Sequence, residues 1–175
     1  IPTIPHIQKL FDDGKIGKSE EQLMTGIISN SLQMITYHSG HSDSGKNVII
    51  LSADSESILS SESAAAAFRS QNWNVFSIGD ISSSIDVLFD LELRKLLSKT
   101  WKSKEGVMIV LVFSQTEEGL KFISDSFYSV KEKSENNLFI VLSGKTGKKV
   151  KIKGDLSASK LEDILQWSNT KYENS

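Results

Sequence analysis

The chain has 175 residues, a formal net charge of −2 and no cysteine. This length fits one domain, which at this size buries about 70% of the surface of the unfolded chain and needs no disulfide or structural metal. The charge provides no overall positive field that would attract nucleic acid or an anionic membrane. The lack of cysteine excludes thiolate nucleophiles, disulfides and cysteine-ligated zinc or iron–sulfur sites. It favours a reducing compartment such as the cytosol but does not identify one.

The longest apolar run, Val107–Phe113, is far shorter than the roughly 20 residues that a membrane-spanning helix needs. The chain begins with Ile1 and not with methionine, so we expect a fragment or a processed product. Membrane association is therefore expected only through a segment that is absent from this chain.

Residues 1–46 are expected to form two helices that pack on an α/β core of residues 47–175. The second helix begins with a capping-box pattern at Ser19 and is expected to end near Tyr37. Its apolar stripe, with spacings typical of one helix face, consists of Leu23, Met24, Ile27, Ile28, Ser31 and Ile35. This stripe either packs on the flank of the sheet or supplies a partner-binding face, because the helix lies outside the alternating pattern that follows.

Strands and helices alternate along the core. The strands are predicted at 47–52, 73–78, 107–113 and 138–142. The strand 107–113 is apolar at every position, which is typical of a central parallel strand covered by helices on both faces. The alternation predicts right-handed crossovers and a three-layer αβα sandwich with a mainly parallel sheet, Rossmann-like or flavodoxin-like.

The connection after the strand 138–142 differs from the earlier ones. Only residues 143–148 separate it from the next expected strand, 149–153. A parallel crossover needs about a dozen residues or more. The segment is therefore predicted to be a hairpin turn, which makes the fifth strand an antiparallel edge strand.

Residues 137–167 combine a strand, a tight turn, a lysine-rich strand and an amphipathic helix, and they resemble the closing ββα unit of thioredoxins. The resemblance implies a thioredoxin-like fold as the alternative architecture. The chain has no cysteine for a redox pair and no proline near Leu138, where that family places a cis-proline. The implied domain would therefore be redox-inactive.

Four polar residues fall at the predicted carboxyl ends of parallel strands, where open α/β sheets bind ligands. These candidate ligand-binding residues are Asp54, Asp80, Ser114 and Ser143. The two aspartates could hold a ribose or a divalent cation, or they could be solvated loop and cap residues. The loop 53–57 is acidic and lacks glycine, so it would repel a pyrophosphate.

Other candidate motifs do not meet the requirements of their chemistry. Residues 40–47 and 143–146 resemble phosphate-binding loops but do not lie between a strand and a following helix. His38, His41 and Asp43 could form a metal or acid–base cluster, but a solvated loop is the favoured interpretation. We therefore predict no catalytic residue, no cofactor and no metal site.

Lys149, Lys151 and Lys153 alternate with apolar residues, so they share one face of the fifth strand. They could protect a sheet edge from unwanted pairing or form a basic patch for an acidic partner, a phospholipid or a nucleic acid. No aromatic residue interleaves them, which argues against binding of single-stranded nucleic acid.

Reactive residues are missing at the places where enzymes of this architecture hold them. The leading hypothesis is therefore a non-catalytic protein-binding or adaptor domain on a degenerate α/β scaffold, with another protein as its partner. One alternative is a ligand- or nucleotide-binding enzyme domain that uses the strand ends. The other is a redox-inactive thioredoxin-like scaffold domain.

Overall fold

Five strands form one sheet in the computed structural model, which describes residues 3–37, 43–81, 89–101, 105–131, 137–144 and 152–175. The strands are β1 (Asp43–Ser52), β2 (Trp73–Asp80), β3 (Val107–Ser114), β4 (Leu138–Gly144) and β5 (Leu156–Ser157). Their order is β2-β1-β3-β4-β5, and every neighbouring pair is parallel. This is the flavodoxin-like order, in which the winding direction reverses between β1 and β3.

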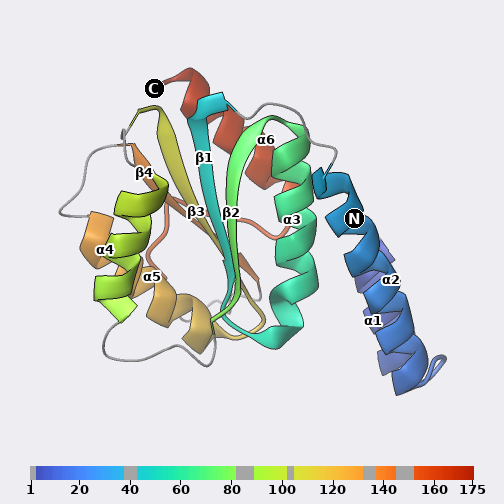
Figure 1. The fold of residues 1–175 in the computed structure, drawn as a ribbon. Helices are drawn as coiled ribbons and strands as arrows, with labels where there is room; N and C mark the ends of the chain where they lie inside the picture. The colour runs from blue at the N-terminus through green and yellow to red at the C-terminus, as the bar shows by residue number, and fades with distance from the viewer. Residues whose placement is uncertain (1–2, 38–42, 82–88, 102–104, 132–136, 145–151) are drawn as a thin grey trace.

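Helices cover both faces of the sheet, as Figure 1 shows. The helices are α1 (Thr3–Asp12), α2 (Lys18–Tyr37), α3 (Ile58–Ser70), α4 (Phe89–Thr100), α5 (Glu117–Lys131) and α6 (Leu161–Glu173), with a short 3-10 helix η1 (Ser55–Ser57) before α3. Helices α3 and α6 supply one hydrophobic core, and α4 and α5 supply the other. The predicted three-layer αβα architecture with a parallel sheet is confirmed.

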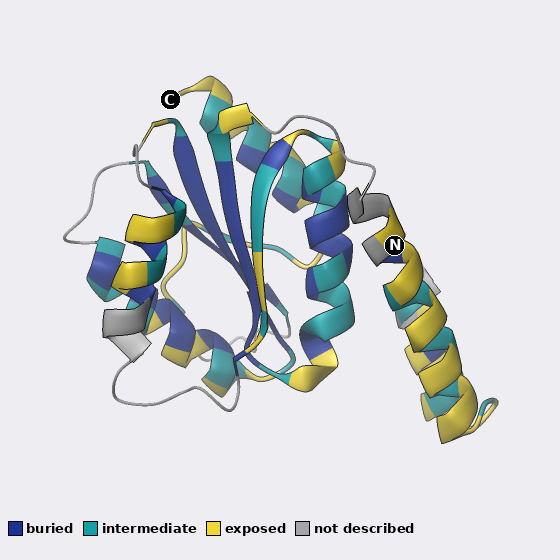
Figure 2. Ribbon diagram, in the orientation of Figure 1, coloured by how far each residue is buried: buried dark blue, intermediate teal, exposed yellow. Residues whose placement is uncertain are grey.

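The eight residues of β3 are all buried, which explains why its sequence shows no alternation. Alternate side chains enter opposite cores. Met108 and Val110 pack in the core with α4 and α5, while Ile109 and Leu111 pack in the core with α3 and α6. Figure 2 shows the central strands as the most continuously buried part of the chain.

The prediction of an antiparallel edge strand after β4 is wrong. The fifth strand is Leu156–Ser157, and it runs parallel to β4. Residues 145–155 connect the two strands, which gives the chain enough length to return to the other end of the sheet. Asp155 then fixes the entry to β5, because its carboxylate accepts the backbone N–H of Ile140 at 2.7 Å and the ammonium of Lys131 at 2.6 Å.

The predicted strand 149–153 lies mostly outside the described residues, and Ile152 and Lys153 are not in a strand. All strand pairs of the described chain are parallel. The sheet therefore agrees with the flavodoxin-like architecture and not with the thioredoxin-like alternative, which requires an antiparallel pair.

The N-terminal helices form a hairpin outside the three layers. Helix α2 lies against the outer side of α3 and not against the sheet (Figure 1). The hydroxyl of Ser29 donates to the Glu62 carboxylate of α3 at 2.6 Å. The predicted cap at Ser19 is wrong, because the helix begins at Lys18 and the Glu20 carboxylate accepts the N–H of Gly17 at 2.8 Å.

The two-sided burial of β3 predicts a large difference between two leucines. Leu111→Ala should lower the free energy of unfolding by about 2–5 kcal/mol, since it removes buried methyl groups and leaves a cavity. Leu23→Ala, at a position that is 66% exposed on α2, should change it by less than about 0.5 kcal/mol. Urea unfolding followed by circular dichroism measures both, and equal losses would contradict the burial pattern.

Candidate functional site

The point where the winding direction of the sheet reverses lies between β1 and β3, and ligands of such sheets bind beyond the strand ends at this point. Asp54 follows β1, and Ser114 is the last residue of β3. The structure brings them together: the Ser114 hydroxyl donates to the Asp54 carboxylate at 2.7 Å. Two of the four candidate residues predicted from the sequence are therefore in direct contact.

The carboxylate of Asp54 accepts three hydrogen bonds from the surrounding loops. One oxygen accepts the backbone N–H of Ser57 at 2.9 Å. The other accepts the Ser114 hydroxyl at 2.7 Å and the backbone N–H of Gln115 at 2.7 Å. Burial raises the pKa of Asp54, but these hydrogen bonds outweigh it and hold the pKa below its ordinary value of 3.8. Asp54 thus ties the loop after β1 to the loop after β3.

Close packing surrounds Ser114 as well. A Cβ atom at Gly119, in the first turns of α5, would lie 2.8 Å from the Ser114 hydroxyl oxygen and 3.0 Å from the Cβ of Ala53. A Cβ atom at Gly144 would clash with the carbonyl oxygen of Ser114. Position 144 therefore needs glycine, because the backbone of Ser114 approaches it too closely for a side chain, and a side chain at position 119 would force the Ser114 and Thr116 hydroxyls to move.

The other two candidate residues flank this contact. Asp80 is exposed at the end of the edge strand β2, where it stands opposite Ser52 in the β1–β2 register. Ser143 is buried on β4, opposite Phe113 of β3. Among the described residues, no three or more His, Asp or Glu side chains are grouped so that they could hold a metal ion. Ligand binding by these four residues stays a prediction.

The histidines of the predicted His38, His41 and Asp43 cluster lie outside the described residues. Asp43 itself begins β1, and its carboxylate accepts the N–H of Gly45 and the hydroxyl of Tyr172, each at 2.9 Å. These two hydrogen bonds lower the pKa of Asp43. Asp43 therefore joins the end of α6 to the start of the sheet.

Of the three lysines predicted as a basic patch, Lys149 and Lys151 lie outside the described residues. Lys153 is exposed, and its ammonium lies 5.4 Å from the centre of the Tyr128 ring. Partner binding by these lysines stays a prediction.

A basic–aromatic cluster that the sequence did not indicate surrounds the start of β4. The ammonium groups of Lys131 and Lys171 lie 5.5 Å and 5.3 Å from the centre of the Phe139 ring. That ring packs edge-on against Trp167 at 5.7 Å. Three different elements supply these side chains, so no spacing along the sequence could have indicated them. The cations lie over rings at cation–π distances, which stabilises the packing of α5 and α6 beside β4.

The exposed apolar residues gather on α2. Large hydrophobic side chains that are exposed in the described chain are Leu23, Ile27, Met34, Ile78 and Phe122, and the first three share one face of this helix. Their exposed fractions are 66%, 58% and 70%. Figure 2 shows the α1–α2 hairpin as mostly exposed. The predicted stripe is therefore divided: Met24 and Ile28 are partly buried, whereas Leu23 and Ile27 face solvent.

No protein family profile and no curated protein sequence matches the chain. Among solved structures, the monomethylamine corrinoid protein of Methanosarcina barkeri is similar over 98% of this chain and 78% of its own, with a TM-score of 0.66 and 12% sequence identity. At this identity the likeness concerns the fold. The described part of the chain contains no helix of the length and hydropathy needed to span a membrane.

The hydrogen bonds of Asp54 predict a specific loss of stability. Asp54→Asn should lower the free energy of unfolding by about 1–3 kcal/mol at neutral pH, since an amide cannot accept hydrogen bonds at both of its ends and leaves donors unsatisfied. Glu56→Gln, an exposed carboxylate in the same loop, should change it by less than about 0.5 kcal/mol. Chemical denaturation at pH 7 compares the two variants. An unchanged stability of Asp54→Asn would contradict the role of Asp54 in joining the loops after β1 and β3.

The effect of Asp54 should also depend on pH. Because the folded-state pKa lies below the ordinary value of 3.8, the contribution is complete above that value and is lost as the pH falls through the folded-state pKa. The difference in stability between the wild type and Asp54→Asn should be constant from about pH 5 to about pH 7 and shrink below about pH 4. Denaturant unfolding at a series of pH values measures it. A stability difference that grows as the pH falls would contradict the lowered folded-state pKa of Asp54.

Proposed function

We propose that the chain is a non-catalytic protein-binding domain, an adaptor built on an α/β scaffold. The observation that carries this proposal is the exposed apolar face of α2, formed by Leu23, Ile27 and Met34. Contiguous exposed apolar surface on a folded domain marks interaction sites, because its burial against a partner is favourable. Helices with such a face bind in apolar grooves or against other helices.

The state of the strand ends supports the same proposal. Asp54 follows the strand next to the reversal point, where a ligand-binding domain would need a free side chain. Its carboxylate already accepts three hydrogen bonds from Ser57, Ser114 and Gln115. A carboxylate accepts about four in total, so little capacity is left for a ligand.

A ligand-binding role at the strand ends is the second candidate. It is favoured by the fold likeness to a corrinoid protein and by the position of Asp54 and Ser114 at the reversal point. A ligand at this place would have to replace the hydrogen bonds that now join the two loops. The adaptor proposal requires no such rearrangement.

The two candidates predict different responses to ligands. The adaptor proposal predicts an unchanged melting temperature with nucleotides, divalent cations, S-adenosylmethionine or cobalamin, and an unchanged absorption spectrum of cobalamin. A ligand present at about 100 times its dissociation constant would stabilise the fold by about 2.7 kcal/mol. A reproducible rise in melting temperature that disappears in Asp54→Asn would establish the ligand-binding role instead.

The adaptor proposal also predicts capture of a protein through α2. Affinity purification of the tagged chain should recover a protein, either a different one or an untagged copy of the chain, that Ile27→Glu loses by about tenfold or more, because a buried unpaired charge is costly in an apolar interface. Gln22→Glu adds the same charge to the same helix outside the stripe and should retain it. Quantitative mass spectrometry compares the three samples. Equal recovery with Ile27→Glu, or recovery of nothing by the wild type, would contradict the proposal.

A further inference from the structure

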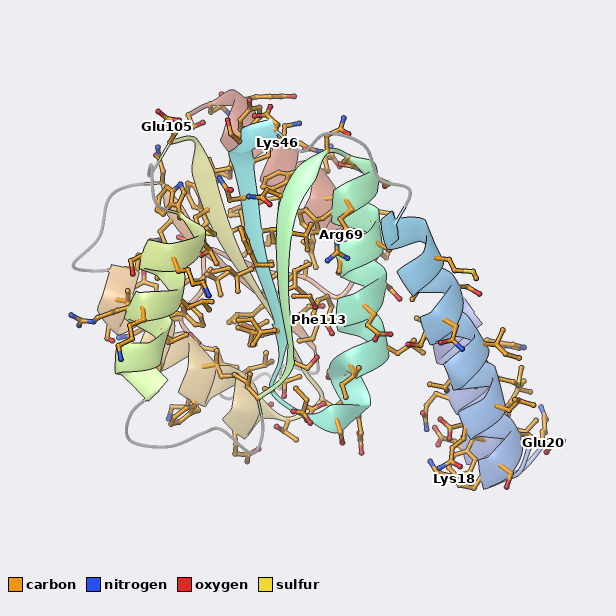
Figure 3. The ribbon with its side chains drawn as sticks, in the orientation of Figure 1. Lys18, Glu20, Lys46, Arg69, Glu105 and Phe113 are labelled. Atoms are coloured by element: carbon orange, nitrogen blue, oxygen red, sulfur yellow. The ribbon has the colours of Figure 1, made fainter. Side chains whose placement is uncertain are left out.

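The N-terminal hairpin is attached to the domain differently from the other helices. We propose that α1 and α2 open from α3 as one unit while the three layers stay folded, so that the outer face of α3 is covered in one state and uncovered in the other. This conformational change goes beyond the protein-binding function proposed above and does not depend on it. Figure 3 shows Lys18 and Glu20 at the far end of the hairpin, away from the α/β layers.

The two hydrophobic cores of the sandwich do not extend into the hairpin. Among the described residues, both cores consist of side chains from position 48 onward, and α1 and α2 contribute none. The apolar side chains that are buried in the described part of the hairpin are Ile7 and Leu32. Burial of apolar surface is the main favourable contribution to folding. The hairpin can therefore separate from the domain without opening either core.

The hairpin contacts the domain mainly through α3. Helix α2 packs along α3, and the Ser29 hydroxyl donates to the Glu62 carboxylate at 2.6 Å. Leu32 follows Ser29 by three positions, which places it on the same side of α2. The hydrogen bond adds little to the docking, because both groups bond to water when they separate. The docked state therefore depends on a narrow strip of α2.

The face of α3 beneath the hairpin is buried although it points away from the sheet. Ala64, Ala65 and Phe68 belong to the core between α3 and the sheet. Ser63 and Ala66 lie on the opposite side of the helix by its period of 3.6 residues, yet each is only 4% exposed. Because α2 packs on this outer side of α3 (Figure 1), opening of the hairpin would uncover Ser63 and Ala66.

The helices of the hairpin also depend on docking for their own stability. Helix α1 has 10 residues and α2 has 20 residues. Helices of this size are marginal in water on their own, because most helix stability in proteins comes from packing. Backbone amides of α2 therefore exchange with solvent when the hairpin opens, and their exchange rate measures the population of the open state.

Hydrogen exchange on the full chain tests the opening, under conditions where reclosing is faster than exchange. Amides of α2 should exchange at least about a hundredfold faster than amides of β3, because opening of the hairpin requires less free energy than unfolding of the whole chain. Their rates should also rise less steeply with urea, since the opening exposes less surface.

Two substitutions in the layer of α4 and α5, on the far side of the sheet from α3, distinguish opening from unfolding of the whole chain. Ile123→Val should speed exchange of β3 by about two- to tenfold, and Leu120→Ala by about thirtyfold or more, because both side chains are fully buried there. Neither should change the exchange of α2, since this core stays folded in the open state.

Two leucines of α2 form the matched pair for the docking contact. Leu32→Ala should speed exchange of α2 by about tenfold or more, because Leu32 is buried in the docked state. Leu23→Ala, on the exposed side of the same helix, should leave the exchange of α2 within about threefold of the wild type.

Thiol labelling tests whether α3 becomes uncovered, and the chain contributes no cysteine of its own. Ala66→Cys should react with an aromatic disulfide reagent at least about tenfold faster than Ala64→Cys, because Ala66 lies under the hairpin and Ala64 lies against the sheet. Adding Leu32→Ala should speed the labelling at position 66, and adding Ile123→Val should leave it unchanged.

Equal exchange rates in α2 and β3 would overturn the proposal, because the hairpin would then open only with the whole chain. A rise in α2 exchange that matches the rise in β3 in Ile123→Val or Leu120→Ala would have the same meaning. Equal labelling of Ala66→Cys and Ala64→Cys would also overturn it, as would exchange of α2 at the rate of an unfolded chain, since no docked state would exist. None of these results depends on capture of a protein through Ile27, so the two proposals can fail separately.

Discussion

Burial of β3 on both faces is the constraint on which the rest of the structure depends. Its eight residues are all buried, so helices must cover the sheet on each side. Helices α3 and α6 fill one layer, and α4 and α5 fill the other. The N-terminal hairpin then has no sheet face left to cover, and α2 packs on the outside of α3. This arrangement leaves Leu23, Ile27 and Met34 exposed.

The same sheet determines what the strand ends can do. Because β1 and β3 are neighbours, the loops that follow them meet at the reversal point of the winding. In this chain the Ser114 hydroxyl donates a hydrogen bond to the Asp54 carboxylate, and Gly119 and Gly144 pack closely around this pair. Hydrogen bonds within the chain therefore hold the loops after β1 and β3 together. A likeness of fold to a corrinoid protein does not by itself transfer a ligand to this rim.

Most of the fold was predictable because its signals are local. The run 107–113 is apolar at every position, which indicated a strand buried on both faces, as observed. The apolar periodicity after Ser19 indicated a helix that ends near Tyr37, which is also observed. The direction of β5 was not predictable in this way. The short spacing to Lys149 and the alternating lysines are typical of a hairpin, whereas the actual strand at 156–157 is fixed by contacts of Asp155 with Lys131 and Ile140, which are distant in sequence.

The candidate site was likewise predictable only in part from the sequence. The rule that parallel strand ends meet at one edge placed Asp54 and Ser114 on the same rim, but not in a hydrogen bond across 60 positions of sequence. Helical periodicity showed that Leu23 and Ile27 share a face, yet it does not tell which neighbour covers that face. Only the arrangement of layers shows that α3 covers the other side of α2.

Hydrogen–deuterium exchange on the full chain tests the central claim most directly, because it reports on α2 and on the strand-end loops in one experiment. When the chain engages its protein partner, the account predicts slower exchange in peptides covering residues 20–34 and no change in those covering 53–57 and 114–116. Slower exchange in the strand-end loops on addition of a small ligand, with α2 unchanged, would contradict it.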